Sequence, residues 1–240
     1  MALLEQIAVV PRSGVTWDYD PAAWYFEIPA TAQLRAEGLR LDSAVTVLVG
    51  ENGSGKSTLV EAVATAWHQS LTGAQAEHWL AGAGPEDADL HRHLEFTGHQ
   101  PRPHGGCFLR AETMHATFSR ADAAGVRDYG GRLNTRSHGE SFLGSLSGRP
   151  VEIGLWVLDE PEAALSFQSC LALLALLSDL ASEGSQILLA THSPVLAACP
   201  GAAVLELGPH GIRRTRWDEL DMVQSWRAFL AAPERFLRHL

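Results

Sequence analysis

Short apolar runs alternate with amphipathic stretches along the chain. The apolar runs are nearly uninterrupted, which is the pattern of strands buried on both faces of a parallel sheet. They are residues 44–49, 106–110, 154–158 and 186–190. Apolar residues with helical spacing follow in 57–68 and 165–180. Strands that alternate with helices predict an α/β fold with a mostly parallel core sheet.

Shorter patterns mark the two ends of the chain. Near the start, residues 6–10 and 24–28 have the apolar and aromatic character of short strands, with prolines between them. Residues 203–207 and 211–214 predict a hairpin. Two amphipathic helices are expected at about 217–230 and 233–240, and a helix is also expected at 141–146.

The segment 69–105 differs from the rest of the chain, because it is rich in Gly, Ala, His, Pro and acidic residues and has weak periodicity. This composition predicts a variable surface insertion, partly helical, within a single domain that spans residues 1–240. Five histidines in it have no spacing typical of a metal site, so we expect solvated loop residues. They are His78, His91, His93, His99 and His104.

Composition narrows the class of protein. The chain has 240 residues, of which 46% are hydrophobic and 19% charged, as expected for one globular domain. A net charge of −10 argues against broad, non-specific nucleic-acid binding but leaves a local basic patch possible. The three cysteines have neither metal-ligand nor disulfide spacing, so buried thiols are expected. The absence of a basic, apolar leader and of a bilayer-spanning run predicts a cytoplasmic protein.

The strongest motif follows the apolar run at 44–49. The sequence GENGSGKS satisfies G-x-x-x-x-G-K-[ST] between a predicted strand and a predicted helix, the context of a phosphate-binding loop. Its backbone N–H groups and the following helix N-terminus favour phosphate. The expected nucleotide-binding residues are Gly50, Glu51, Asn52, Gly53, Ser54, Gly55, Lys56, Ser57 and Thr58.

Within this loop, Lys56 and Ser57 have distinct expected roles. Lys56 is the chain's single lysine among 18 basic residues, and its compact ammonium would reach the β- and γ-phosphates of ATP. The Ser57 hydroxyl would bind Mg²⁺. The motif therefore predicts ATP and Mg²⁺ as cofactors.

Two further apolar strands end in residues that could act on a bound nucleotide. Asp159 and Glu160 follow the run at 154–158, and His192 follows the run at 186–190. Parallel strands place their carboxyl ends at the edge of the sheet where ligands bind. We expect Asp159 to hold Mg²⁺, Glu160 to be the general base for the attacking water, and His192 to contact the γ-phosphate and orient Glu160.

These motifs together resemble the ABC-type ATPases, and more narrowly the small stand-alone bacterial ATPases of the AAA-family or ABC-like type. The matching segments occur in family order at 50–58, 108–112, 137–141, 155–165 and 187–194. The resemblance implies a P-loop NTPase fold with a mostly parallel core sheet, antiparallel β elements at the N-terminus and a small insertion.

The resemblance also implies further site residues. Ser137 and Gly139 occupy the place of the family's signature loop, which reaches the nucleotide of a second subunit, although His138 and Glu140 depart from the usual residues. Glu112 stands where the family carries a Gln near Mg²⁺, and we expect it to be a possible metal ligand.

Two more features have family counterparts. Residues 163–165 resemble the short loop that contacts the second subunit of the dimer. Trp24, Tyr25 and Phe26 are candidates for stacking on adenine, although burial in the core explains them equally well.

The expected function is ATP hydrolysis in a head-to-tail homodimer that opens and closes with the γ-phosphate. Glu112 and His138 favour a stand-alone ATPase acting on a macromolecule, either a nucleic acid or a protein. The alternative is the ATP-binding subunit of an ABC transporter with a membrane partner. A non-hydrolysing nucleotide-binding scaffold is a third possibility, which the intact Lys56, Asp159, Glu160 and His192 argue against.

Overall fold

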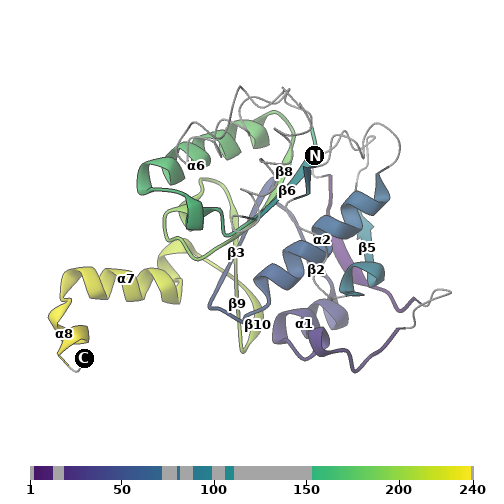
Figure 1. Ribbon diagram of the computed structural model, residues 1–240, viewed down its shortest axis with the longest axis horizontal. Coiled ribbons are helices and arrows are strands. Elements are labelled where there is room, and N and C mark those ends of the chain that lie inside the picture. Colours follow the sequence, from purple (N-terminus) through teal and green to yellow (C-terminus); the bar gives the residue numbers. More distant parts are fainter. Residues whose placement is uncertain are drawn as a thin grey trace, which may run out of the picture.

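The chain folds around two β-sheets. The structure is a computed structural model, and it describes residues 3–12, 19–71, 80–81, 89–98, 106–110 and 153–238. Within these residues, a seven-stranded sheet has the order β10-β9-β3-β8-β7-β6-β4, and a three-stranded sheet has the order β2-β1-β5. Figure 1 shows the arrangement of the elements.

The larger sheet is parallel from β9 to β4, and only β10 runs antiparallel to its neighbour β9. Its strands are β3 (Val45–Gly50), β4 (Leu80–Ala81), β6 (Gly106–Arg110), β7 (Leu155–Asp159), β8 (Gln186–Thr191), β9 (Ala203–Gly208) and β10 (Gly211–Thr215). The α/β fold with a mostly parallel core sheet is therefore confirmed. The buried strands and the C-terminal hairpin expected from the sequence are also present.

Helices cover both faces of this sheet, as Figure 1 shows for α2 and α6. The α-helices are α1 (Pro29–Glu37), α2 (Lys56–Ser70), α6 (Phe167–Ser182), α7 (Asp221–Ala231) and α8 (Glu234–Leu237). Short 3₁₀ helices are η1 (Trp24–Phe26), η2 (Asp89–His93), η4 (Pro161–Ala164), η5 (Leu196–Ala198) and η6 (Trp217–Glu219). Ser166 begins α6 by accepting a hydrogen bond from the Ser169 backbone N–H.

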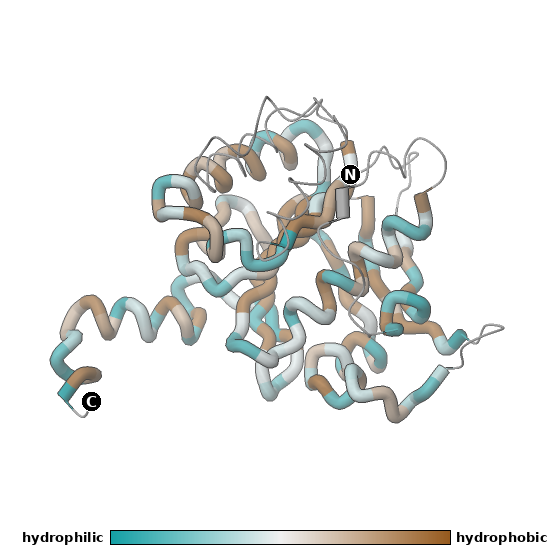
Figure 2. The backbone as a smooth tube through the Cα atoms, viewed as in Figure 1, coloured by the Kyte–Doolittle hydropathy of each residue, from teal (hydrophilic) through white to brown (hydrophobic). Residues whose placement is uncertain are grey.

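Alternation along each strand divides the apolar side chains between two cores. Leu48 and Leu188 point into the core that contains α2 and the smaller sheet. Val47 and Leu189, their neighbours in sequence, point into the core that contains α6. Both faces are buried, which explains why these strands are continuous apolar runs. Figure 2 shows the hydrophobic residues concentrated on the central strands.

The smaller sheet contains β1 (Gln6–Val9), β2 (Leu39–Arg40) and β5 (Leu94–Thr97), with β1 antiparallel to both neighbours. The antiparallel N-terminal β elements are therefore confirmed. The position of β5 corrects one expectation, the surface insertion predicted for residues 69–105. Leu90 and His93 are 0% and 1% exposed, so this part of the segment lies in the core. Its polar composition hid the alternation of β5, which spans four residues.

The prediction of a strand at 24–28 was wrong. Residues 24–26 form the 3₁₀ helix η1, and α1 begins at Pro29, a favourable first helical residue. Tyr25 and Phe26 are adjacent and both buried, which a strand in a one-sided sheet cannot achieve. Their rings contact each other, with centroids 4.7 Å apart. Tertiary packing thus overrides the β-propensity of these aromatic residues.

The last two helices, α7 and α8, lead away from the body of the molecule (Figure 1). They confirm the expected C-terminal helices, although α7 begins four residues later than predicted, because η6 precedes it. Across the described residues, no helix has the length and apolar character needed to cross a membrane.

Candidate functional site

The phosphate-binding loop joins β3 to α2. Gly55 is the N-terminal cap of α2 and has a φ of 93°, a conformation that favours glycine. A Cβ atom on Gly55 would lie 2.6 Å from Ile28 Cγ2, and one on Gly50 would lie 2.4 Å from the Leu207 carbonyl oxygen. Both glycines are therefore required by the close approach of neighbouring segments, and the loop has the backbone shape of a phosphate cradle.

Lys56 is the first residue of α2 and is 3% exposed. Its ammonium donates hydrogen bonds to the carbonyl oxygens of Gly50, at 2.9 Å, and Glu51, at 3.2 Å. Burial lowers the pKa of this ammonium, while the carboxylates of Glu160, Asp159 and Glu162 oppose the decrease. The side chain thus lies folded over the loop, with its charge beside the expected phosphate position.

Ser57 and Asp159 meet at the C-terminal edge of the sheet. The Ser57 hydroxyl donates a hydrogen bond of 3.1 Å to Asp159 Oδ1, although 102 residues separate the two in sequence. Burial raises the pKa of the Asp159 carboxyl, and hydrogen bonds from Arg110 and Ser57 oppose this rise. A hydroxyl and a carboxylate oxygen in contact form a suitable pair for Mg²⁺, a cation that prefers oxygen ligands.

Glu160 and His192 form the second pair. His192 Nε2 lies 2.9 Å from Glu160 Oε1, and both side chains are about one-third exposed. The His192 backbone N–H donates to Glu162 Oε1 at 2.5 Å, which fixes the start of the loop after β8. A carboxylate in contact with an imidazole at the rim of the sheet has the composition of a site that can position and deprotonate a water molecule.

Strand order explains why these groups come together. The consecutive strands β3, β8 and β7 end respectively at the phosphate-binding loop, at His192 and at Glu160. The register pairs Val49 with Thr191 and Asp159 with Ala190, so the three strand ends lie level with one another. The sequence predicts this juxtaposition from the two strand ends alone.

Arg110 and Glu61 complete the described cluster, and neither was expected there from the sequence. Arg110 Nε donates to Asp159 Oδ2 at 2.9 Å, and Arg110 Nη2 donates to Glu61 Oε2 at 3.0 Å. Arg110 and Glu61 are each 7% exposed. A signal was available, since Arg110 ends an apolar strand and Glu61 interrupts the apolar residues of α2.

The aromatic candidates for adenine stacking divide by exposure. Tyr25 and Phe26 are 4% and 5% exposed and pack in the core, so they are not accessible to a base. Trp24 is 54% exposed and belongs to the segment that leads to Ile28, the residue beside Gly55. Trp24 is therefore the aromatic residue of this segment that remains a candidate.

Several predicted residues lie outside the described ranges. They are Glu112 and the signature-loop residues Ser137 and Gly139, together with the helix expected at 141–146. Their roles therefore stay predictions. Within the ranges that are described, no group of three or more His, Cys, Asp or Glu side chains could hold a metal ion, and His91 and His93 are buried.

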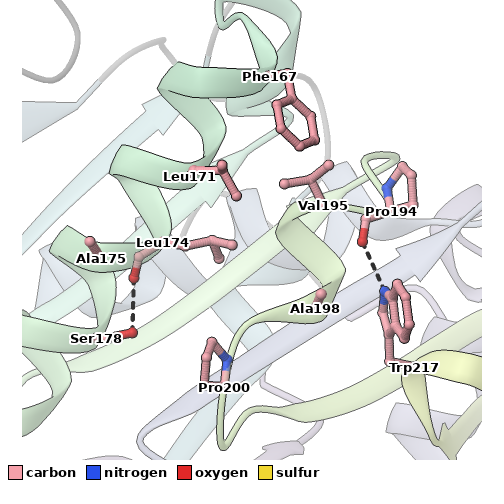
Figure 3. A pocket seen from close by; sticks show the side chains of 10 residues that line it. All are labelled: Phe167, Leu171, Leu174, Ala175, Ser178, Pro194, Val195, Ala198, Pro200 and Trp217. Atoms are coloured by element: carbon pink, nitrogen blue, oxygen red, sulfur yellow. Dashed lines mark hydrogen bonds between the residues drawn. The ribbon is translucent and has the colours of Figure 1, made fainter.

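An apolar groove of about 480 Å³ lies between α6 and the segment that follows β8 (Figure 3). Its lining residues are Phe167, Leu171, Leu174, Ala175, Ser178, Pro194, Val195, Ala198, Pro200 and Trp217. The Trp217 indole N–H donates to the Pro194 carbonyl oxygen at 2.8 Å and closes one end. Since no charged side chain lines this groove, it lacks the chemistry of a phosphate site.

The residues at the sheet edge fit ATP with Mg²⁺. The glycine cradle leaves no room for added side chains at Gly50 and Gly55, and Lys56, Ser57 and Asp159 supply one cation and a pair of oxygen ligands. Ser54 Oγ is buried and has no hydrogen-bond partner among the described residues, so it is free to donate to a phosphate oxygen. These features define a P-loop nucleotide site.

A curated relative identifies the family. The chain is 30% identical over 182 residues to the cytochrome c biogenesis ATP-binding export protein CcmA of Paramagnetospirillum magneticum (strain AMB-1), an alignment covering 67% of this chain and 80% of the relative. The chain belongs to the ABC-type ATPases, which bind and hydrolyse ATP. No protein-family model matches it.

Solved structures include similar folds at lower identity. CbiO1 of Clostridium perfringens, part of the ABC transporter complex cbiONQ, is 15% identical over 100% of both chains, with a TM-score of 0.49. An ATP-binding subunit of an ABC transporter is 16% identical over 90% of this chain and 91% of its own, with a TM-score of 0.44. Both TM-scores are below 0.5, so the family assignment rests on the curated relative and on the motifs.

Proposed function

We propose that the described cluster is the ATPase site and that its residues have the roles expected from the motifs. The observation that carries this proposal is the pairing of Ser57 with Asp159, 3.1 Å apart, beside the pairing of Glu160 with His192, 2.9 Å apart. Residues 50–58 bind the phosphates, with Lys56 as the cation nearest the β- and γ-phosphates.

Each pair has a separate task. Ser57 and Asp159 hold Mg²⁺, which, when bound, neutralises charge on the phosphates. Glu160 accepts a proton from the attacking water, and His192 holds the Glu160 carboxylate in place from the neighbouring strand. Glu112 is a further candidate ligand for Mg²⁺, supported by its position two residues after Arg110 at the end of β6.

Substitution of Glu160 tests the site. Glu160→Gln keeps the shape of the side chain but removes the base, so we expect kcat for phosphate release to fall about 100- to 1,000-fold with little change in ATP affinity. Glu183→Gln, an exposed change at the end of α6, is the matched control and should retain full activity. Undiminished hydrolysis by Glu160→Gln would exclude Glu160 as the base.

The site is completed by a second copy of the chain in this proposal. Ser137 and Gly139 of one protomer would contact the nucleotide bound by the other, and residues 163–165 would contact the partner beside it. Because the γ-phosphate is present only before hydrolysis, it favours the closed dimer. Light scattering of Glu160→Gln with saturating ATP and Mg²⁺ should show a dimer, and a monomer under these conditions contradicts the closed-dimer model.

The partner we propose is a membrane-embedded transporter subunit. Glu112 and His138 favour a stand-alone ATPase, but the relative identified by sequence is an ATP-binding export protein, which supports the alternative. In this role, dimer closure on ATP drives a conformational change in the membrane partner, and hydrolysis reverses it.

Fractionation of the source cells tests this partner. A tagged chain should pellet with membranes, and cross-linking followed by mass spectrometry should identify one polytopic membrane protein in fixed stoichiometry with it. Recovery of the chain wholly in the supernatant, with no cross-link to a membrane protein, would contradict the transporter role.

A stand-alone ATPase acting on a macromolecule is the second candidate. It is supported by Glu112 and His138, which replace the residues that transporter subunits of the family usually carry. Phosphate release measured with and without DNA addresses this candidate directly, since a nucleic-acid-processing ATPase should be stimulated by DNA. If DNA does not change the rate of hydrolysis, DNA is excluded as the macromolecule on which the ATPase acts. A protein is then the expected target of the stand-alone ATPase.

A further inference from the structure

Arg110 is a buried charge that none of the roles above uses. It ends β6, a strand whose other residues are Gly106, Cys107, Phe108 and Leu109, all buried and uncharged. The strand register pairs Arg110 with Asp159 on the adjacent strand β7, so the two side chains lie on the same face of the sheet. A buried guanidinium is costly unless carboxylates compensate it, and among the described residues the carboxylates of Asp159 and Glu61 do so.

We infer that Arg110 is a positioning residue that orients Asp159 for Mg²⁺. This inference rests on the metal role proposed for Ser57 and Asp159. The guanidinium holds Asp159 Oδ2 at 2.9 Å, while the Ser57 hydroxyl contacts Oδ1 at 3.1 Å. Because Arg110 fixes Oδ2, only Oδ1 of the carboxylate can face Ser57. Asp159 Oδ1 and the Ser57 hydroxyl oxygen are the pair of oxygens suited to the metal.

The same guanidinium ties Asp159 to the helix that carries Ser57. Arg110 Nη2 donates to Glu61 Oε2 at 3.0 Å, and Glu61 follows Ser57 by four residues on α2, which is one helical turn. Arg110 therefore bridges α2 and β7 and fixes the separation of the two metal-binding side chains. A planar, forked cation can make both contacts at once, whereas a lysine ammonium has no such fixed geometry.

Glu61 also sets the charge that Asp159 presents. A carboxylate paired with a guanidinium alone is neutral as a pair and attracts a divalent cation weakly. The second carboxylate, 7% exposed, restores a net negative charge to the cluster of Glu61, Arg110 and Asp159. The arrangement thus orients Asp159 through Arg110 without cancelling its attraction for Mg²⁺.

The experiment measures the Mg²⁺ concentration that half-saturates binding of a fluorescent ATP analogue, mant-ATP, which requires no turnover. Arg110→Gln should raise this concentration about tenfold, the effect typical of losing a group that orients a metal ligand. Glu61→Gln should raise it about threefold through loss of charge. The double variant should need more Mg²⁺ than Arg110→Gln alone, because the charge of Glu61 contributes separately from the orientation by Arg110.

Arg213→Gln is the matched control, because Arg213 also pairs with a buried carboxylate, Glu206, and lies on the edge strand β10, which β9, β3 and β8 separate from the strand β7 that carries Asp159. It should leave the Mg²⁺ requirement unchanged. An unchanged or lowered Mg²⁺ requirement in folded Arg110→Gln overturns the inference, since a merely structural charge would affect the thermal unfolding midpoint alone. If Arg110→Gln does not fold, the Mg²⁺ concentration that half-saturates mant-ATP binding is measured for Arg110→Lys and Glu61→Gln, and an unchanged value in both overturns the inference.

The metal role of Ser57 and Asp159 and the positioning role of Arg110 are contradicted by different results. Wild-type mant-ATP binding that is indifferent to Mg²⁺, with Asp159→Asn also without effect, would contradict the metal role of Ser57 and Asp159. The positioning role alone would be contradicted by a different result. In that case mant-ATP binding depends on Mg²⁺ in the wild type, Asp159→Asn weakens this dependence, and Arg110→Gln has the same half-saturating Mg²⁺ concentration as the wild type.

Discussion

Glu160 carries the backbone strain of the site. Among the described residues it is the one non-glycine residue with a positive φ, at 47° with ψ at 48°. This left-handed conformation costs about 1–3 kcal/mol and persists only when the surroundings fix it. The Glu160 N–H donates to the Ala190 carbonyl at 2.9 Å, and the Glu160 carbonyl accepts from Ala163 N–H at 3.1 Å. The conformation turns the carboxylate from the strand axis toward His192.

The cysteines provide a test of burial at the scale of single residues. Cys107, Cys170 and Cys199 are free and buried, and burial raises the pKa of the Cys170 and Cys199 thiols above the ordinary value of 9.0. Since only the thiolate reacts, we expect the native protein to react with Ellman's reagent at neutral pH at least about 100-fold more slowly than free cysteine. In urea, all three thiols should react quickly.

The pH dependence of this reaction has a defined direction. A raised thiol pKa moves the midpoint of thiolate formation to higher pH, so native-state reactivity should still rise about tenfold per pH unit at pH 9.0, where a thiol of ordinary pKa begins to level off. Ser182→Cys places a thiol on the exposed end of α6 and serves as the fast-reacting control. Rapid labelling of one native cysteine at neutral pH would show that its segment opens locally.

At the scale of elements, one side chain joins the N-terminal segment to the large sheet. Gln186 begins β8 and is 2% exposed. Its Oε1 accepts from the Leu4 backbone N–H at 2.7 Å, and its Nε2 donates to the Leu4 carbonyl at 2.8 Å. The glutamine thus satisfies both buried backbone groups of a residue 182 positions away, much as a paired strand would.

Replacement of this glutamine should be costly. Gln186→Leu keeps the volume but leaves two buried backbone groups unpaired, so we expect the free energy of unfolding in urea to fall by about 3 kcal/mol. Gln224→Leu, at an exposed position on α7, should change it by less than about 0.5 kcal/mol. Equal, small effects of the two substitutions would mean that water or a shift of Leu4 replaces the lost hydrogen bonds.

The elements that the sequence predicted well are those whose burial is uniform. The strands β3, β7 and β8 are apolar throughout because helices cover both faces, so their runs and the motifs at their ends are visible in the sequence. The phosphate-binding loop, Asp159, Glu160 and His192 were recognised for the same reason. Short polar β5 and the aromatic turn η1 were missed, because tertiary packing determines their conformation.

The Arg110 cluster illustrates a different limit of sequence reasoning. A single arginine at the end of an apolar strand predicts a side chain whose guanidinium reaches solvent, as arginine side chains usually do. Its burial depends on Glu61, 49 residues earlier, and on Asp159, 49 residues later. Only the sheet order, with β6 beside β7 and α2 packed against both, brings the three charges together.

At the scale of the whole molecule, the protein combines a compact two-sheet body with a projecting C-terminal arm, residues 221–238 (Figure 1). In this arm only Val223 is buried, and α8 contributes no buried residue. The aromatic rings of the arm contact one another instead, with centroids 6.5 Å apart for Trp226 and Phe229 and 5.7 Å apart for Phe229 and Phe236. The arm therefore adds little to the folded body.

Truncation tests this separation. A chain that ends at Ala232 loses α8 but uncovers no buried side chain of the body, so we expect its thermal unfolding midpoint to stay within about 2 °C of the full chain. A chain that ends at Leu220 also loses Val223, which is 2% exposed and packs in the core beside α6, so its midpoint should fall further, by about 4 °C or more. Equal, large decreases in both truncated chains would show that α8 packs against the body in solution, and the arm would then be part of the folded core.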